Sequence, residues 1–223
     1  MKSWPVPELN CRLLPNFQLD DWNAVEAAFA GADGCEMGQG WRAEPEPHFQ
    51  PASVRLGWRD NRLWVYARLQ DRDIFNDATR LNDATYELGD IFEILVRPIA
   101  QDAYFEFHVT PENQHLQLRW PDVQAIERYS GKHQSLQPFL FREKVLESQT
   151  SVQAELHQWR VLDGVPATVA ESPRIHEGDI WSFSFSRYDY ARGVAEPVLS
   201  SSSPHAVPKF HRQQEWGLLR FIM

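Results

Sequence analysis

The chain has 223 residues, a length that suits one large β domain as well as two small ones. Hydrophobic residues make up 43% of it, which is enough for a packed core and argues against disorder. The formal net charge of −9 argues against a nucleic-acid or anionic-membrane partner, because phosphate binding relies on clusters of Lys and Arg.

The sequence shows no targeting or membrane signal. The N-terminal stretch MKSWPVPELNCRLLP is interrupted by prolines and lacks an apolar run of signal-peptide length. No segment reaches the roughly 18 apolar residues of a membrane span. We therefore expect a soluble, cytoplasmic protein. Its two cysteines, Cys11 and Cys35, have no metal-ligand spacing and could form at most one disulfide.

The first 50 residues predict an extension rather than a domain of their own. Residues 1–19 contain prolines at positions 5, 7 and 15 and are expected to be extended. Leu19–Ala30 predicts one short helix with Asp20 as its N-cap, because apolar residues recur on one helical face. Gly31–Pro51 is broken by glycines and prolines and predicts a loop.

Alternation of apolar and polar residues then predicts two hairpins. The first pairs Val54–Trp58 with Leu63–Leu69 around a polar turn. The second pairs Asp90–Arg97 with Ala103–Thr110 across the loop Pro98–Asp102. Between the two hairpins the chain is polar and rich in aspartate.

The rest of the chain continues in short strands. They are expected at Gln114–Trp120, Phe139–Arg142, Ser151–Val161, Ile180–Ser186 and Glu215–Ile222, with a Ser/Pro-rich loop at Gly193–Lys209. Many short strands with a single minor helix predict an all-β fold, an antiparallel two-sheet β-sandwich of jelly-roll type. We expect one domain over residues 1–223, with residues 1–50 packing on the sandwich.

The second hairpin carries the best candidate for a binding surface. Glu106 and His108 alternate with aromatic and β-branched residues, so one face can be buried while the other carries a carboxylate and an imidazole. Glu93 falls on the same side if the two strands pair. An acidic, partly aromatic sheet face suits a ligand rich in hydroxyl groups better than it suits nucleic acid.

Several sequence patterns between about residues 50 and 221 occur in a characteristic order. They are Val54–Trp58, Leu63–Tyr66, an Asp-rich loop from Asp71, Tyr86-Glu87 before Gly89–Glu93, the aromatic strand Tyr104–Val109, Gly178–Trp181, Ser186–Tyr188, and Phe210-His211 before Trp216-Gly217. This order resembles that of the family 9 carbohydrate-binding modules and the wider DOMON-like group. The resemblance implies a β-sandwich that holds sugar between two aromatic side chains, with structural calcium near the acidic loops.

The resemblance also assigns roles to individual residues. Tyr86 lies near the place of one sandwiching aromatic residue, and Glu93 matches a glutamate that helps to bind the sugar. The second aromatic partner should come from the loop before the final strand, which offers His205, Phe210 and His211.

These arguments together predict a non-catalytic carbohydrate-binding protein for a mono- or oligosaccharide. The predicted ligand-binding residues are Tyr86, Glu93, Glu106, His108, Trp64 and Arg68. Aromatic rings can pack on the apolar face of a sugar while charged groups bind its hydroxyls. Calcium, which prefers oxygen ligands, is expected at Asp71, Asp73, Asp77 and Asp90.

Two other functions stay open from the sequence. Glu93 and Glu106 could be the paired carboxylates of a glycoside hydrolase, which lie about 5 Å or about 6.5–9.5 Å apart depending on the mechanism. DOMON-like relatives also include haem-binding domains, which hold iron through side chains such as Met and His. A serine triad built on Ser200–Ser203 lacks a nucleophile-elbow motif and is set aside.

Overall fold

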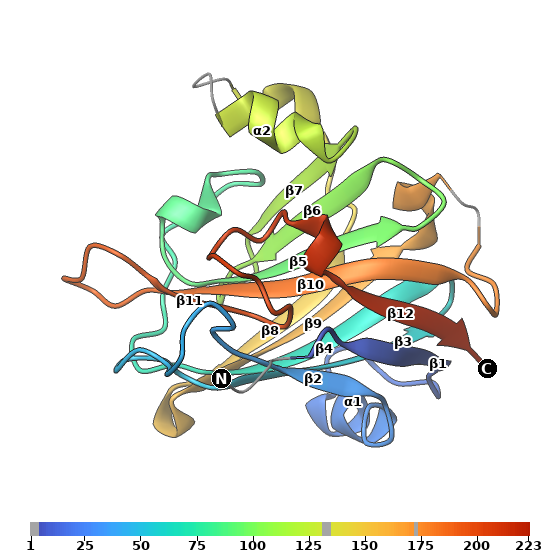
Figure 1. Ribbon diagram of the computed structural model, residues 1–223. Coiled ribbons are helices and arrows are strands. Elements are labelled where there is room, and N and C mark those ends of the chain that lie inside the picture. The colour runs from blue at the N-terminus through green and yellow to red at the C-terminus, as the bar shows by residue number, and fades with distance from the viewer. Residues whose placement is uncertain (1–4, 131–134, 172–173) are drawn as a thin grey trace.

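The structure is a computed structural model that describes residues 5–130, 135–171 and 174–223, most of them in strands (Figure 1). The strands are β1 (Glu8–Leu13), β2 (Gly34–Met37), β3 (Ala52–Arg59), β4 (Arg62–Gln70), β5 (Ile91–Pro98), β6 (Tyr104–Val109), β7 (His115–Trp120), β8 (Glu147–Gln153), β9 (Gln158–Pro166), β10 (Ile180–Asp189), β11 (Val198–Ser201) and β12 (Gly217–Ile222). The helices are α1 (Trp22–Ala28) and α2 (Gln124–Ser130), with short 3-10 turns η1 (Thr85–Glu87), η2 (Gln137–Phe139), η3 (Ala154–Leu156), η4 (Ala167–Ala170) and η5 (Gln213–Glu215).

The twelve strands of the described ranges all belong to one sheet. Its main path runs β7-β6-β5-β10-β12-β1-β3-β4-β9-β8, with β11 added to β10 and β2 added to β3. β1 pairs in parallel with both β12 and β3, whereas the other strand pairs are antiparallel. The chain is mainly β, as predicted, but the expected pair of separate antiparallel sheets is wrong. Alternation identifies a strand and its buried face, yet it does not identify the strand's partner or direction.

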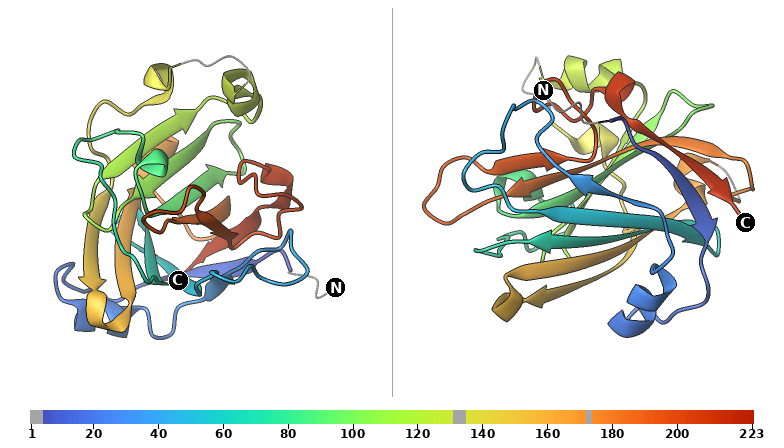
Figure 2. Two further views of the ribbon diagram at one scale, coloured as in Figure 1. Left: turned by 90° about the vertical axis from the view of Figure 1, so that its left-hand side faces the viewer. Right: turned by 60° about the horizontal axis from the view of Figure 1, so that its bottom comes forward.

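The sheet curls like half of a barrel, so that its two ends enclose a common core (Figures 1 and 2). Inward-facing side chains of β3, β4 and β9 form one apolar cluster with those of β5, β6 and β10. Within it the rings of Phe92 and Phe185 stack with their centroids 5.8 Å apart. Both predicted hairpins are confirmed, because β3 pairs with β4 and β5 pairs with β6. Burial of this continuous apolar surface is the main force that holds the curled sheet closed.

The N-terminal segment is built into the sheet. β1 lies between β12 and β3, so the first strand pairs with the last one. The indole Nε1 of Trp58 donates to the carbonyl of Ile222 at 2.8 Å and ties β3 to the end of the chain. Cys11 packs in the inner core, and both Cys11 and Cys35 are free thiols.

α1 packs on the outer face of the β4–β9 half of the sheet. Its N-cap is Asp21, whose carboxylate accepts the backbone N–H groups of Asn23 and Ala24 at 3.0 and 3.1 Å. The predicted cap, Asp20, is therefore one residue too early, and the helix is shorter than the predicted Leu19–Ala30. The described part of the chain holds no helix with the length and apolar composition needed to cross a bilayer.

Some predicted element boundaries are wrong for local reasons. The expected strand Phe139–Arg142 follows the 3-10 turn η2, and only Leu140 makes an isolated bridge, to β7. The expected strand Ser151–Val161 is two strands, because His157 adopts a left-handed conformation with φ of 48° and reverses the chain. α2 and the four-residue strands β2 and β11 were missed, since elements this short leave little periodic signal.

Asp163 on β9 is a buried carboxyl group without a hydrogen-bond partner. It alternates with Val161 and Val165 of the inner core, is 0% exposed, and neither carboxylate oxygen is hydrogen bonded within the described residues. Burial raises the pKa of Asp163 well above its usual value. Above the ordinary pKa of aspartate, the unfolded state releases this proton while the folded state keeps it. The free energy of unfolding therefore falls as the pH rises through this range.

We expect Asp163→Val to raise the free energy of unfolding by about 1–3 kcal/mol, because an unsatisfied buried polar group is removed. Urea unfolding at pH 4 and pH 8 measures the effect, which should be larger at pH 8. The matched control, Asp102→Val at an exposed position, should stay within about 0.5 kcal/mol of wild type. An Asp163→Val protein that is less stable at both pH values would contradict this reading.

Candidate binding site

The outer face of the β5–β6 hairpin brings three predicted residues together. Glu93 is paired in register with His108, and Glu106 lies two residues before His108 on the same face of β6. The Nε2 atom of His108 lies 3.2 Å from Glu93 Oε1 and 2.8 Å from Glu106 Oε1. Strand pairing and alternation predicted that the three side chains share one face, and the structure adds that one imidazole nitrogen bridges the two carboxylates.

Neighbouring polar groups fix this cluster in place. The hydroxyl of Thr85 lies 3.0 Å from His108 Nδ1, on the far side of the imidazole ring. The indole Nε1 of Trp120 donates to Glu106 Oε2 at 2.6 Å. The His108 ring is therefore held by hydrogen bonds at both of its nitrogens, and the Trp120 ring is held at its single nitrogen.

The electrostatics of the cluster favour an ion pair. Burial alone would lower the pKa of His108, but its hydrogen bonds to Glu106 and Glu93 outweigh burial and raise the pKa to about 9. Burial would raise the pKa of Glu106, but the nearby His211 and the hydrogen bonds from His108 and Trp120 lower it. His108 is accordingly protonated at neutral pH and Glu106 is ionised.

Two polar atoms at this cluster lack partners. The Oε2 atom of Glu93 and the Oγ atom of Ser186 are both buried, and neither forms a hydrogen bond with any residue that the structure describes. Ser186 on β10 is the register partner of Glu93 on β5, so the two side chains lie side by side on the outer face. An unmet buried acceptor costs roughly 1–3 kcal/mol, which makes Glu93 Oε2 a place where a ligand donor would be stabilised.

Aromatic rings surround the carboxylates. The ring of Tyr86 stands edge-on to His108 with centroids 6.0 Å apart, and Tyr104 stacks on Trp120 at 6.2 Å. The Tyr104 hydroxyl lies 2.8 Å from Nδ1 of His211. Burial, followed by the charges of Glu93 and Glu106, raises the pKa of Tyr188 well above its usual value, which places its hydroxyl close to the cluster.

The cluster is buried, which the sequence did not predict. Glu93, Glu106 and His108 are 2%, 5% and 1% exposed, not a solvated sheet face. Phe210 and Trp216, which come from the segment before β12, pack with Tyr104 and Trp120 over this part of the sheet. The cluster is therefore covered by other parts of the chain, with the partly exposed Tyr86 and His211 at its border.

A series of hydrogen bonds through Ser184, His205 and Glu215 anchors the segment before β12, which is here called the covering segment. The imidazole of His205 lies 3.4 Å from Ser184 Oγ through Nε2 and 2.9 Å from Glu215 Oε2 through Nδ1. Arg212 donates to both oxygens of Glu215. Ser184 and His205 are both fully buried, so this arrangement ties the covering segment to β10 and does not present a nucleophile to solvent.

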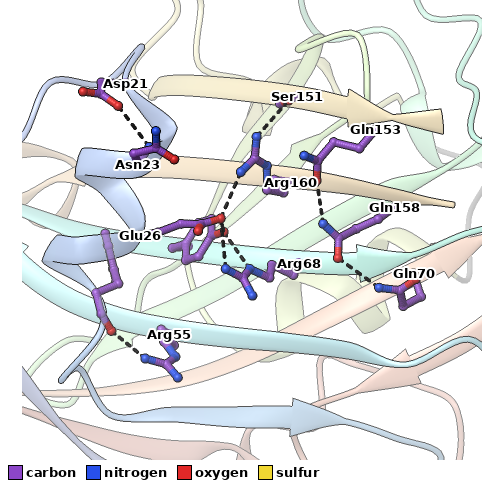
Figure 3. A network of polar contacts seen from close by, with 12 residues as sticks. Asp21, Asn23, Glu26, Arg55, Arg68, Gln70, Ser151, Gln153, Gln158 and Arg160 are labelled. Carbon is purple, nitrogen blue, oxygen red and sulfur yellow. Dashed lines mark hydrogen bonds and ion pairs between the residues drawn. The ribbon is translucent and has the colours of Figure 1, made fainter. Parts of the chain in front are cut away.

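Trp64 and Arg68 lie elsewhere, which corrects their assignment to this site. Trp64 is buried under the α1 region, with its ring edge-on to Phe17 at 5.5 Å. Arg68 lies 2.9 Å from Glu26, which also accepts from Arg160 (Figure 3). Alternation placed both side chains on the outer face correctly, but that face belongs to the other half of the curled sheet.

The acidic segment contributes to a second buried cluster. Asp71 and Asp90 lie together with Asp189, their nearest carboxylate oxygens all within 4.8 Å of one another. Nη2 of Arg187 lies 2.9 Å from Asp71 Oδ2 and 3.3 Å from Asp189 Oδ1. Both oxygens of Asp90 accept backbone N–H groups, from Phe75 and Tyr190. The guanidinium thus already supplies a cation here, so this donor set does not fit calcium unless Arg187 moves away.

The other two predicted calcium ligands lie outside this cluster. Asp73 pairs with Arg192, and Asp77 is exposed. Calcium binding by the four aspartates stays a prediction, which thermal melting in excess calcium and in chelator tests directly. A higher melting temperature with calcium is expected if the ion binds the folded state, and equal melting temperatures would contradict the prediction.

No family model and no curated protein sequence matches the chain. Solved structures do match it. The chain is similar to a "putative carbohydrate-binding protein" from Bacteroides uniformis, with a TM-score of 0.75 and 15% identity over 98% of this chain and 100% of that one.

Two further structures are of a family 9 carbohydrate-binding module from Caldicellulosiruptor kristjanssonii. The complex with cellotriose has a TM-score of 0.63 and 13% identity over 96% of this chain and 93% of that one. The complex with glucose has a TM-score of 0.62 and 13% identity over 97% and 96%. The chain therefore has the fold of these modules, which confirms the resemblance at the level of architecture.

Proposed function

We propose that the protein binds a carbohydrate, without catalysis, at the cluster of side chains around Glu93. The observation that carries this proposal is the Oε2 atom of Glu93, buried among aromatic rings and without a hydrogen-bond partner in the described residues. A sugar hydroxyl is a donor of the right kind for this oxygen. The similarity of the fold to structures that hold cellotriose and glucose supports the same ligand class.

The cluster offers both kinds of contact that a sugar needs. Glu93 Oε2 would accept a hydroxyl proton, and the neighbouring Ser186 hydroxyl would donate or accept a second hydrogen bond. Tyr86, partly exposed at the border, would stack on the apolar face of the ring. Glu106 and His108 would then act by holding Glu93 in position, since their own polar atoms already have partners.

The geometry supports binding over glycoside hydrolysis. A glycosidase general acid needs a carboxyl group whose pKa is raised, with the second carboxylate free to act as nucleophile or base. Here the pKa of Glu106 is lowered, and both Glu93 and Glu106 are bonded to the same nitrogen of His108. Haem binding, the other alternative, is tested by the visible absorption spectrum of the purified protein.

The test is a calorimetric screen of mono- and oligosaccharides, including glucose and cellotriose, with and without calcium. We expect saturable binding of at least one neutral sugar at one site per chain. Release of glucose and cellobiose from cellotriose is followed in parallel by chromatography, and no cleavage is expected. Failure of every sugar to bind, or turnover of an oligosaccharide, would overturn the proposal.

A further inference from the structure

We propose that Glu93, Glu106 and His108 form a binding site for one divalent transition-type metal ion, with zinc as the probe of choice. The three ligand atoms are Oε1 of each glutamate and Nε2 of the histidine. Nε2 lies 3.2 and 2.8 Å from the two oxygens, and each of the three side chains has a ligand atom within 4.8 Å of a ligand atom of the other two. Two ligand atoms that each lie about 2.0–2.2 Å from a shared ion are separated from each other by a distance similar to these Nε2–Oε1 distances.

The ligands are held as metal ligands usually are. A metal-binding histidine commonly uses its second ring nitrogen in a hydrogen bond that fixes the ring, and here Nδ1 of His108 lies 3.0 Å from the buried Thr85 hydroxyl. The second oxygen of Glu106 accepts from Trp120 Nε1 at 2.6 Å. Both side chains are therefore already oriented toward the centre of the cluster, where an ion would take the place of the proton on Nε2 of His108.

The charge of the cluster also favours a divalent ion. Two buried carboxylates face one imidazole. A divalent ion bound to a neutral His108 would bring the same group to neutrality. The unpartnered Oε2 of Glu93, on a side chain that is 2% exposed, is an independent sign that the protein itself satisfies this carboxylate incompletely.

The donor set separates this site from the aspartate cluster. Imidazole nitrogen combined with carboxylate oxygen suits zinc and other first-row ions, whereas calcium prefers oxygen alone. At the aspartate cluster, the guanidinium of Arg187 already lies between Asp71 and Asp189. The partly exposed His211, whose Nε2 lies 3.6 Å from Glu106 Oε2, borders the Glu93 cluster.

The proposal does not depend on a sugar, so the two proposals can fail separately. The whole chain is stripped of metal with a chelator, which is then removed, and titrated with Zn²⁺ by calorimetry. Co²⁺ is used in parallel because its visible absorption reports nitrogen and oxygen ligands. We expect one ion per chain, and a metal affinity at least 100-fold lower for Glu93→Gln, which keeps the shape of the side chain.

Thr85→Val, which removes only the support of His108, should lower the affinity about 10- to 100-fold. The control His176→Ala removes an exposed histidine and should leave the affinity unchanged, which excludes a surface site. Absence of Zn²⁺ binding to the wild-type protein, or equal binding by wild type and Glu93→Gln, would overturn the proposal. Sugar binding measured in the presence of chelator stands or falls independently of either result.

Discussion

His108→Ala is expected to lower the free energy of unfolding by about 3–5 kcal/mol, because it leaves two buried carboxylates without their shared cation. Glu93 and Glu106 are 2% and 5% exposed, so water cannot replace the imidazole freely. The hydrogen bonds from His108 to Glu93 and Glu106, at 3.2 and 2.8 Å, offset the cost of burying the two carboxylates.

Urea unfolding at pH 7, followed by the fluorescence of the tryptophans, measures this effect. His176→Ala is the matched control, since the same truncation at a side chain that is 66% exposed should change stability by no more than about 0.5 kcal/mol. The double variant Glu93→Gln with His108→Ala should recover part of the loss, because one of the two uncompensated charges is gone. Equal stability of His108→Ala and wild type would mean that the three side chains do not form the buried ion pair.

Glu93→Gln is expected to weaken sugar binding roughly tenfold or more, with the fold retained. A charged hydrogen bond contributes roughly 1.5–3 kcal/mol, and the amide keeps the size of the side chain while removing its charge. Its amide also presents either an oxygen or an NH₂ group to the ligand, so the unpartnered acceptor at Oε2 is no longer guaranteed.

Calorimetry in the presence of chelator measures this effect apart from any metal. The control Glu44→Gln makes the same chemical change at an exposed position and should bind sugar as wild type does. Circular dichroism of both variants checks that the sheet is intact. A Glu93→Gln protein that binds sugar with wild-type affinity would place the site elsewhere on the molecule.

Sequence patterns predict the local part of this structure well. The alternation around Glu106 and His108 gave the correct buried and outer faces of β6, and pairing with β5 brought Glu93 to the same cluster. These are relations between residues only a few positions apart or joined by one short turn. The period of a strand is enough to determine them.

The features that sequence reasoning missed depend on distant segments. Phe210 was expected near the site only through the family resemblance, and Trp216 was not expected there, because both come from a segment about a hundred residues after β6 whose position no local pattern shows. The same holds for Arg187, which meets Asp71 from β10. Ser186 was predicted only as the end of a strand, because its position beside Glu93 depends on the pairing of β5 with β10.

The parallel placement of β1 is a further long-range property. Its register against β12 joins the two ends of the chain, and its few residues against β3 join the two halves of the sheet. The pairing of β1 also decides in which half of the curled sheet each strand lies. Trp64 and Glu93 both point outward, but from opposite halves of the sheet, so one site cannot include them both.

The central claim is that the protein binds carbohydrate at Glu93, and a calorimetric titration with cellotriose and glucose in chelator tests it most directly. Wild type, Glu93→Gln and Arg68→Gln are compared, since Arg68 lies on the outer face of the other half of the sheet. We predict saturable binding by wild type and Arg68→Gln, with an affinity at least tenfold lower for Glu93→Gln. Binding that is lost in Arg68→Gln and retained in Glu93→Gln would contradict the claim, as would the absence of binding to the wild-type protein.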